Sequence, residues 1–193
     1  MRRLPALILV IMSGAATAAP PPSGPFDNGQ CVDCHGDASP AVHSYATSKH
    51  GVLVRISTPG RAPDCVRCHT AQGHGASDAE RLRQTCNHCH SPRYIETLHD
   101  NGARMVEIGS MKLLEAMQLL ARARSEFPPG TLSEMEAHYT RMQRHQANLR
   151  LGVAHQSPDY QWWHGHPALD GDLLRLKGAY DRLVRQHATP QAR

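Results

Sequence analysis

Cys31-Val32-Asp33-Cys34-His35 is the first of three C-x-x-C-H segments, which recur at Cys65-Val66-Arg67-Cys68-His69 and Cys86-Asn87-His88-Cys89-His90. C-x-x-C-H is the attachment signature of c-type haem. Two thiols one helical turn apart can bond the edge of one porphyrin, and the histidine that follows is carried under the ring to bind iron. The segments use all six cysteines of the chain. They predict three covalently attached haem c groups, with proximal iron ligands at His35, His69 and His90.

Two other uses of paired cysteines fit the pattern less well. A zinc ribbon combines two C-x-x-C pairs around each metal ion, so three pairs leave one pair unmatched. A disulfide framework needs no histidine after every second cysteine.

The first 18 residues have the pattern of a secretory signal peptide. Arg2 and Arg3 precede an apolar run at positions 4–12, and the small residues Ala16-Thr17-Ala18 follow it. The run is too short to span a bilayer, although an uncleaved N-terminal anchor is the alternative interpretation. We expect cleavage, export to the periplasm and no membrane span in the mature chain. Export suits haem attachment, because thioether bonds are made outside the cytoplasm.

The charge of the chain does not favour a polyanionic partner. The formal net charge is +4, and removal of Arg2 and Arg3 lowers it to +2. The propionates of three haems, set against three ferric irons, bring the oxidised protein to about −1. We therefore expect neither nucleic acid nor an anionic membrane surface as a partner.

The texture of the sequence changes twice. Residues 19–30, which begin Ala-Pro-Pro-Pro-Ser-Gly-Pro, are predicted to be a flexible lead-in. Residues 31–91 contain the three motifs with little sustained periodicity, so we expect loops and short helices wrapped around haem. Residues 92–193 are expected to be helical and to pack on the haems within the same domain. No strand is predicted, and the expected fold class is mainly α.

Three long helices are expected after residue 92. The first covers 94–124 and ends at Phe127-Pro128-Pro129-Gly130. The second begins near Ser133 with a capping-box pattern and runs to about Leu151. A loop is expected from 157 to 165, before a last helix at about 167–187. The buried side chains of this last helix are predicted to be Leu169, Leu173, Leu176, Tyr180 and Leu183.

Each iron has a sixth position, and eleven of the 14 histidines lie outside the proximal positions. His50, His74 and His155 are candidate distal ligands, although each could instead be a solvated or hydrogen-bonded histidine. Three methionines could also bind iron, but their helical spacing favours the core: Met105, Met111 and Met117. The remaining histidines are predicted to be structural or at the surface: His43, His88, His99, His138, His145, His164, His166 and His187. His164 and His166, beside two tryptophans, are the strongest competitors among them.

Longer sequence words surround the motifs. The first C-x-x-C-H is followed by Tyr-x-x-Ser-Lys-His-Gly at 45–51. Ala-Pro-x-Cys-x-x-Cys-His with a histidine in the next loop spans 62–74, Thr-Cys-x-x-Cys-His-Ser spans 85–91, and Leu-Gly-Val-Ala-His spans 151–155 before a Trp-rich stretch. Together these words resemble the last three haem sites and following helices of the octahaem hydroxylamine oxidoreductases. The resemblance covers most of the mature chain. The pentahaem nitrite reductases match these words less well.

The resemblance implies bis-histidine, low-spin haems, with His50, His74 and His155 as distal ligands whose individual haems are not assigned. In that family the substrate binds at a modified haem in an N-terminal half that has no counterpart here. The tyrosine that cross-links this haem in the neighbouring subunit aligns with Trp163. The family's C-terminal helices assemble trimers, so residues 92–151 are a possible homo-oligomer interface, unless their apolar face simply covers haem.

Two classes of function remain. The first is a periplasmic electron carrier that works between other redox proteins and has no open iron position for a substrate. The second is a reductase of nitrite or hydroxylamine, or the haem subunit of such an enzyme. An enzyme requires one open iron and a group such as His164, His166 or Tyr160 acting on the substrate. The departures from the family favour the carrier, with low potentials and no catalytic residue assigned.

Overall fold

The computed structural model describes residues 28–57, 60–69 and 79–188, and within these residues the regular structure is entirely helical. Five short helices come first: α1 (Asn28–His35), α2 (Pro40–Ala46), α3 (Lys49–Ile56), α4 (Cys65–Cys68) and α5 (Ala79–Asn87). The remaining elements are α6 (Pro92–Glu126), the 3₁₀ turn η1 (Pro129–Thr131), α7 (Ser133–His155), α8 (Pro158–Trp162) and α9 (His166–Ala188). The mainly α fold class is confirmed.

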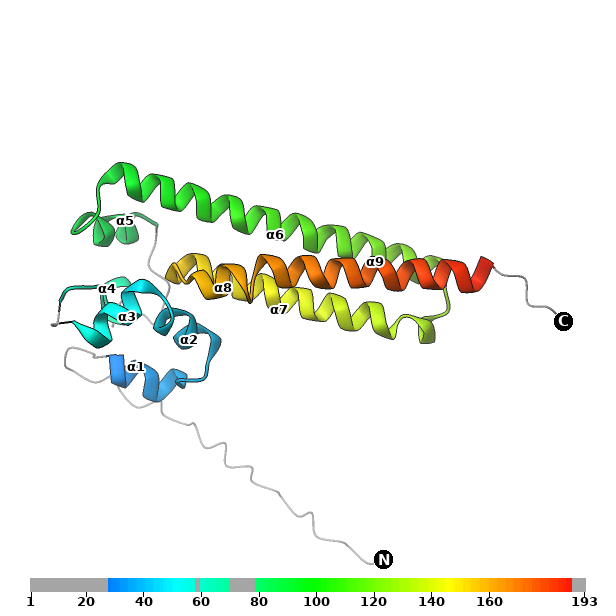
Figure 1. The fold of residues 1–193 in the computed structure, drawn as a ribbon, viewed down its shortest axis with the longest axis horizontal. Helices are drawn as coiled ribbons and strands as arrows, with labels where there is room; N and C mark the ends of the chain where they lie inside the picture. The colour runs from blue at the N-terminus through cyan, green and yellow to red at the C-terminus, as the bar shows by residue number, and fades with distance from the viewer. Residues whose placement is uncertain (1–27, 58–59, 70–78, 189–193) are drawn as a thin grey trace, which may run out of the picture.

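The helices α6, α7 and α9 lie side by side as a long bundle, and the short helices α1–α5 gather at one end of it (Figure 1). Heptad spacing on α7 directs Met135, Met142 and Leu149 into the core, where all three are fully buried. Gly109 permits the close approach of α6 to α7, because a Cβ at this position would lie 2.7 Å from Leu149 Cδ2. The five side chains predicted to be buried on α9 are all in the core.

A buried carboxylate joins α7 to α9 inside the bundle. Asp172 has 3% of its side chain exposed, and its Oδ1 lies 2.9 Å from His138 Nδ1 and 3.1 Å from Arg141 Nε. His145 and Arg175 approach the same carboxylate at 3.4 and 3.5 Å. Burial raises the pKa of Asp172, but hydrogen bonds from His138 and Arg141 more than offset it, so the pKa lies below its ordinary value. The carboxylate is therefore held ionised as a fixed link between the two helices.

The boundaries of the long helices follow the sequence pattern with three differences. The capping-box prediction at Ser133 is wrong: the buried Leu132 occupies the cap position, without a side-chain hydrogen bond, and Ser133 lies inside α7. The same helix continues one turn beyond Leu151 and ends at His155. The expected loop at 157–165 contains α8, which begins at Pro158 with Ser157 as its cap.

Two of the three methionines predicted to be in the core are not there. Met105 packs against the core, whereas Met111 and Met117 are 56% and 46% exposed. Only one stripe of α6 faces α7 and α9, and both methionines lie outside it.

Two predictions concern the beginning of the chain. The predicted signal peptide at 1–18 lies outside the described residues, as does the lead-in except for its last three residues, which begin α1. None of the described helices is long and apolar enough to cross a membrane.

Candidate functional site

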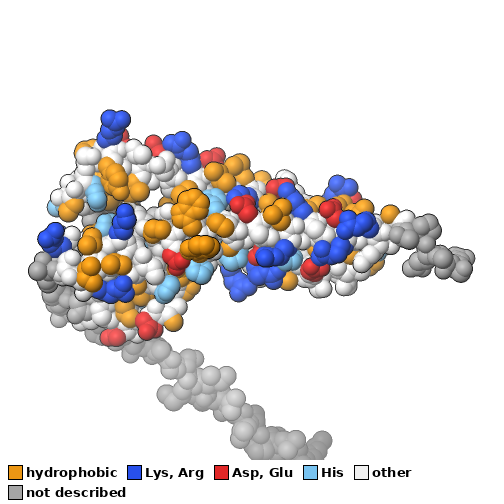
Figure 2. All heavy atoms as spheres, viewed as in Figure 1, with side chains coloured by type: hydrophobic (Ala, Val, Ile, Leu, Met, Phe, Trp, Pro, Cys, Tyr) orange, Lys and Arg blue, Asp and Glu red, His pale blue; other side chains and the backbone are white. Residues whose placement is uncertain are grey.

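The short helices α1–α5 and the turn that joins α5 to α6, here called the head, carry all six cysteines, but their described residues form no hydrophobic core of their own. Among the described residues before α6, only Ser44, Ser48 and Gly51 are buried. Leu53 and Ile56 on α3 are 40% and 74% exposed, and apolar side chains are visible at the surface of the head (Figure 2). A segment of this size needs apolar burial, a metal or a covalent staple to stay folded. The described residues of the head bury too little apolar surface for this.

Hydrogen bonds join the second motif to the helices of the first and third motifs. Cys65 N–H donates to Asn28 Oδ1 at 2.9 Å, which joins α4 to α1. Burial, and next the neighbouring Cys31, raises the pKa of Cys65 to about 11. Burial and then Cys86 raise the pKa of Cys68. No disulfide joins the six cysteines, and two pairs of neighbours come from different motifs: Cys31 with Cys65, and Cys68 with Cys86.

His50 faces His90, the histidine of the third motif. His50 lies in the first turn of α3, which Ser48 caps by accepting from Gly51 N–H at 3.1 Å. The ring centroids of His50 and His90 are 6.2 Å apart, and the rings are inclined by 51°. Burial and then His90 lower the pKa of His50. Tyr94, in the first turn of α6, also stacks on His90, with a centroid separation of 4.9 Å.

His155 faces His69, the histidine of the second motif, in the same way. His69 is the C-cap of α4 and His155 is the last residue of α7. Their ring centroids are also 6.2 Å apart, with the rings inclined by 65°. Burial, with a smaller effect of His69, lowers the pKa of His155 to about 4. The imidazole of His155 is therefore neutral at pH 7, which is the form that binds a metal.

The corner between α7 and α8 fixes the position of His155. Gln156 adopts a left-handed conformation with a φ of 55°, and the chain reverses there. Gly152 lets α8 pack closely on α7, because a Cβ would lie 2.7 Å from the backbone of Tyr160 and Gln161. A hydroxyl pair, Thr47 Oγ1 and Ser157 Oγ at 3.0 Å, ties this corner to the end of α2. His155 is thereby held against the head.

The separation within each imidazole pair matches one shared metal ion. Two imidazoles bound through nitrogen to opposite sides of a metal, with bonds of about 2.0 Å, have ring centroids about 6.3 Å apart. Among residues 28–57, 60–69 and 79–188, no three His, Cys, Asp or Glu side chains converge as a metal-ion site. A porphyrin fills four positions of its iron, so two facing imidazoles are the complement that a haem requires from the protein. The residues of these two pairs therefore fit the predicted group.

The third predicted pair lies partly outside the described residues. His35 ends α1 with an exposed side chain, and His74 is not among the residues described. Of the two competing histidines, His164 lies 3.7 Å from Asp159 and packs on Tyr160, while His166 Nδ1 lies 3.2 Å from Lys112 Nζ. Neither contact joins them to a motif histidine.

Two neighbours of the facing histidines were missed in the sequence. Ser44 Oγ lies 2.6 Å from His155 Nδ1, although the two residues are 111 positions apart. Tyr94 stacks on His90, but its position in a helical pattern gave no sign of that contact. Pairings across such distances leave no mark in local spacing.

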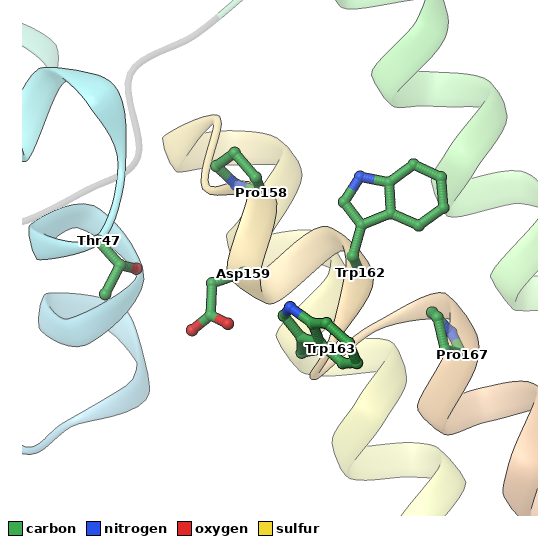
Figure 3. A pocket seen from close by; sticks show the side chains of 6 residues that line it. All are labelled: Thr47, Pro158, Asp159, Trp162, Trp163 and Pro167. Carbon is green, nitrogen blue, oxygen red and sulfur yellow. The ribbon is translucent and has the colours of Figure 1, made fainter.

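A surface hollow of about 510 Å³ lies where α2, α8 and α9 meet (Figure 3). It contains none of the motif residues and none of the facing histidines. Its lining residues are Thr47, Pro158, Asp159, Trp162, Trp163 and Pro167.

No protein-family model matches this chain, and the search of curated proteins also found no match.

Proposed function

We propose that this chain is a periplasmic trihaem c-type cytochrome that carries electrons between redox partners. One observation carries the proposal: two motif histidines each face a second histidine at the separation expected for one shared metal. The small number of buried residues in the described part of the head supports it independently, because three porphyrins would bring apolar surface into the head.

The pairs suggest which residues would hold each haem. Cys86 and Cys89 would bind one porphyrin, with His90 and His50 on its iron. Cys65 and Cys68 would bind a second, with His69 and His155. The third haem would be bound by Cys31 and Cys34 of the first motif, with His35 on its iron. Of the predicted distal ligands, His74 is then the one that remains for this iron.

Haem supplies one-electron redox chemistry, and the protein sets where it happens and at what potential. Two imidazoles on one iron leave no position for a substrate, which suits a carrier. Bis-imidazole ligation and nearby propionates favour the ferric state, so low potentials are expected. Partners would be other redox proteins that dock weakly at the head, where apolar side chains such as Leu53 and Ile56 are exposed.

The first motif is where the alternative function has support. Among the described residues no histidine ring is paired with His35, so its iron is the position at which an enzyme would keep an open site. A reductase of nitrite or hydroxylamine, or a subunit of one, would use that opening.

The ferric spectrum of the purified holoprotein separates the two functions. As a carrier, the protein should show three low-spin irons by electron paramagnetic resonance and optical absorption. Added nitrite or cyanide should change neither spectrum, because no iron has a free position. A high-spin signal that shifts on addition of these ligands would contradict the carrier and support the reductase.

A further inference from the structure

Ser44 contacts His155, one of the two histidines proposed to hold the same haem iron. This serine lies in α2, is fully buried, and places its Oγ 2.6 Å from Nδ1 of His155 at the end of α7. The same Oγ lies 2.9 Å from the carbonyl oxygen of Ala41, one turn back in α2. Ser44 therefore bridges its own helix and the imidazole that faces His69.

The two contacts together fix where the protons lie. A hydroxyl has one proton to donate and can accept at its lone pairs. The carbonyl oxygen of Ala41 can only accept, so the hydroxyl proton of Ser44 goes there. Towards His155 the same oxygen then accepts, which requires the proton of the neutral ring to be on Nδ1. This tautomer leaves Nε2 without a proton.

We propose that Ser44 is a positioning residue that makes Nε2 of His155 the iron-binding nitrogen. It would thereby lower the reduction potential of the haem held by His69 and His155. The inference rests on the proposed function. A hydrogen bond from the far nitrogen of a ligating histidine fixes its tautomer and orientation and makes the ring a stronger donor to the metal. A stronger donor stabilises the ferric state. In the described part of the chain, the rings of His50 and His90 make no hydrogen bond of this kind. The haem held by His69 and His155 should therefore have a lower reduction potential than the haem held by His90 and His50.

The opposite arrangement does not fit a ligand at this position. If the Ser44 hydroxyl donated to Nδ1, the neutral ring of His155 would carry its proton on Nε2. That nitrogen would then have no lone pair for iron, and the carbonyl of Ala41 would lose its contact from the hydroxyl.

The test is Ser44→Ala in the full-length, haem-loaded protein, followed by redox titration and electron paramagnetic resonance. We expect all three haems to remain attached and low-spin. The midpoint potential of one haem should shift upwards and its low-spin signal should move, because His155 loses its acceptor. The other two potentials should stay in place.

Ser157→Ala is the matched control. Ser157 is equally buried and links to Thr47 at the same junction of α2 with the α7–α8 corner, but its hydroxyl does not touch the imidazole. This variant should leave all three potentials unchanged. An equal upward shift in Ser157→Ala would overturn the role of Ser44, because loosening of the junction would then be the cause.

The outcomes also separate this inference from the proposed function. Unchanged potentials in Ser44→Ala, with three bis-histidine haems retained, would overturn the inference alone. A wild-type protein without three such haems would overturn the proposed function. If Ser44→Ala does not accumulate in holo form, the exchangeable Nδ1 protons of the axial ligands in the wild-type protein decide. Their exchange with deuterium, followed by electron–nuclear double resonance, should show one slowly exchanging buried proton, and its absence would contradict the inference.

Discussion

Replacement of His155 by alanine is expected to convert one of three low-spin irons into a high-spin iron that binds cyanide. The proposed attachment residues Cys65, Cys68 and His69 are unchanged, so the haem should stay bound while its sixth position opens. About one third of the low-spin signal should be lost, because one of three irons loses an imidazole. Electron paramagnetic resonance of the oxidised protein, with and without cyanide, measures both effects.

His164→Ala is the control for this result. The ring of His164 is half exposed and contacts Asp159 and Tyr160, so its removal should leave all three irons low-spin. The pairing itself is tested by removing the second attachment site with Cys65→Ser and Cys68→Ser. In that background His155→Ala should add no high-spin iron, whereas His50→Ala should still add one. The reverse pattern would show that the facing pairs are assigned to the wrong motifs.

Asp172→Asn is expected to destabilise the helical bundle by about 3 kcal/mol, at the lower end of the range for breaking a buried ion pair. The amide keeps the shape of the side chain but removes the charge that faces His138 and Arg141. The loss stays at the lower end because Arg141 has 38% of its side chain exposed and remains partly hydrated. Urea unfolding of the holoprotein at neutral pH, followed by the helical circular dichroism signal, measures the difference.

Asp170→Asn is a matched control on the same helix. Asp170 pairs with Lys112 at 2.6 Å but is 53% exposed, so its loss should cost less than about 1 kcal/mol. A similar loss in both variants would contradict the special role of the buried carboxylate.

The pH dependence of this effect has a definite sign. Folding lowers the pKa of Asp172 below its unfolded value of 3.8. The contribution of Asp172 to stability is therefore fully present above pH 3.8 and is lost as the pH falls through the lower pKa of the folded state. The difference between wild type and Asp172→Asn should therefore hold at neutral pH and shrink below pH 3.8. A difference that grew on acidification would contradict the assigned pKa direction.

Local patterns in the sequence were enough to predict the helices of the bundle. The apolar spacing before Phe127 predicts α6, and the five predicted apolar positions of α9 are all buried. Helical periodicity is a property of neighbouring residues, so it can be read without knowing the partner helix. The same periodicity does not tell how wide the covered stripe is, which is why Met111 and Met117 were placed wrongly in the core.

The surroundings of the candidate site could not be predicted, because they are formed by contacts between residues far apart in the sequence. The position of His155 opposite His69 depends on the corner at Gln156 and on the close packing at Gly152, and both depend on the path of the chain in space. The helix α8 was expected to be a loop, because a five-residue helix has too few positions to show a period. The bond between Ser44 and His155 joins residues 111 positions apart and had no local signal.

Intact mass of the exported protein, compared with its mass after chemical cleavage of thioether bonds, tests the central claim most directly. If the head is completed by porphyrins bound through its six cysteines, the difference must equal three haem groups. A difference of two haems or fewer, or free thiols that react with an alkylating reagent in the purified protein, would contradict the account.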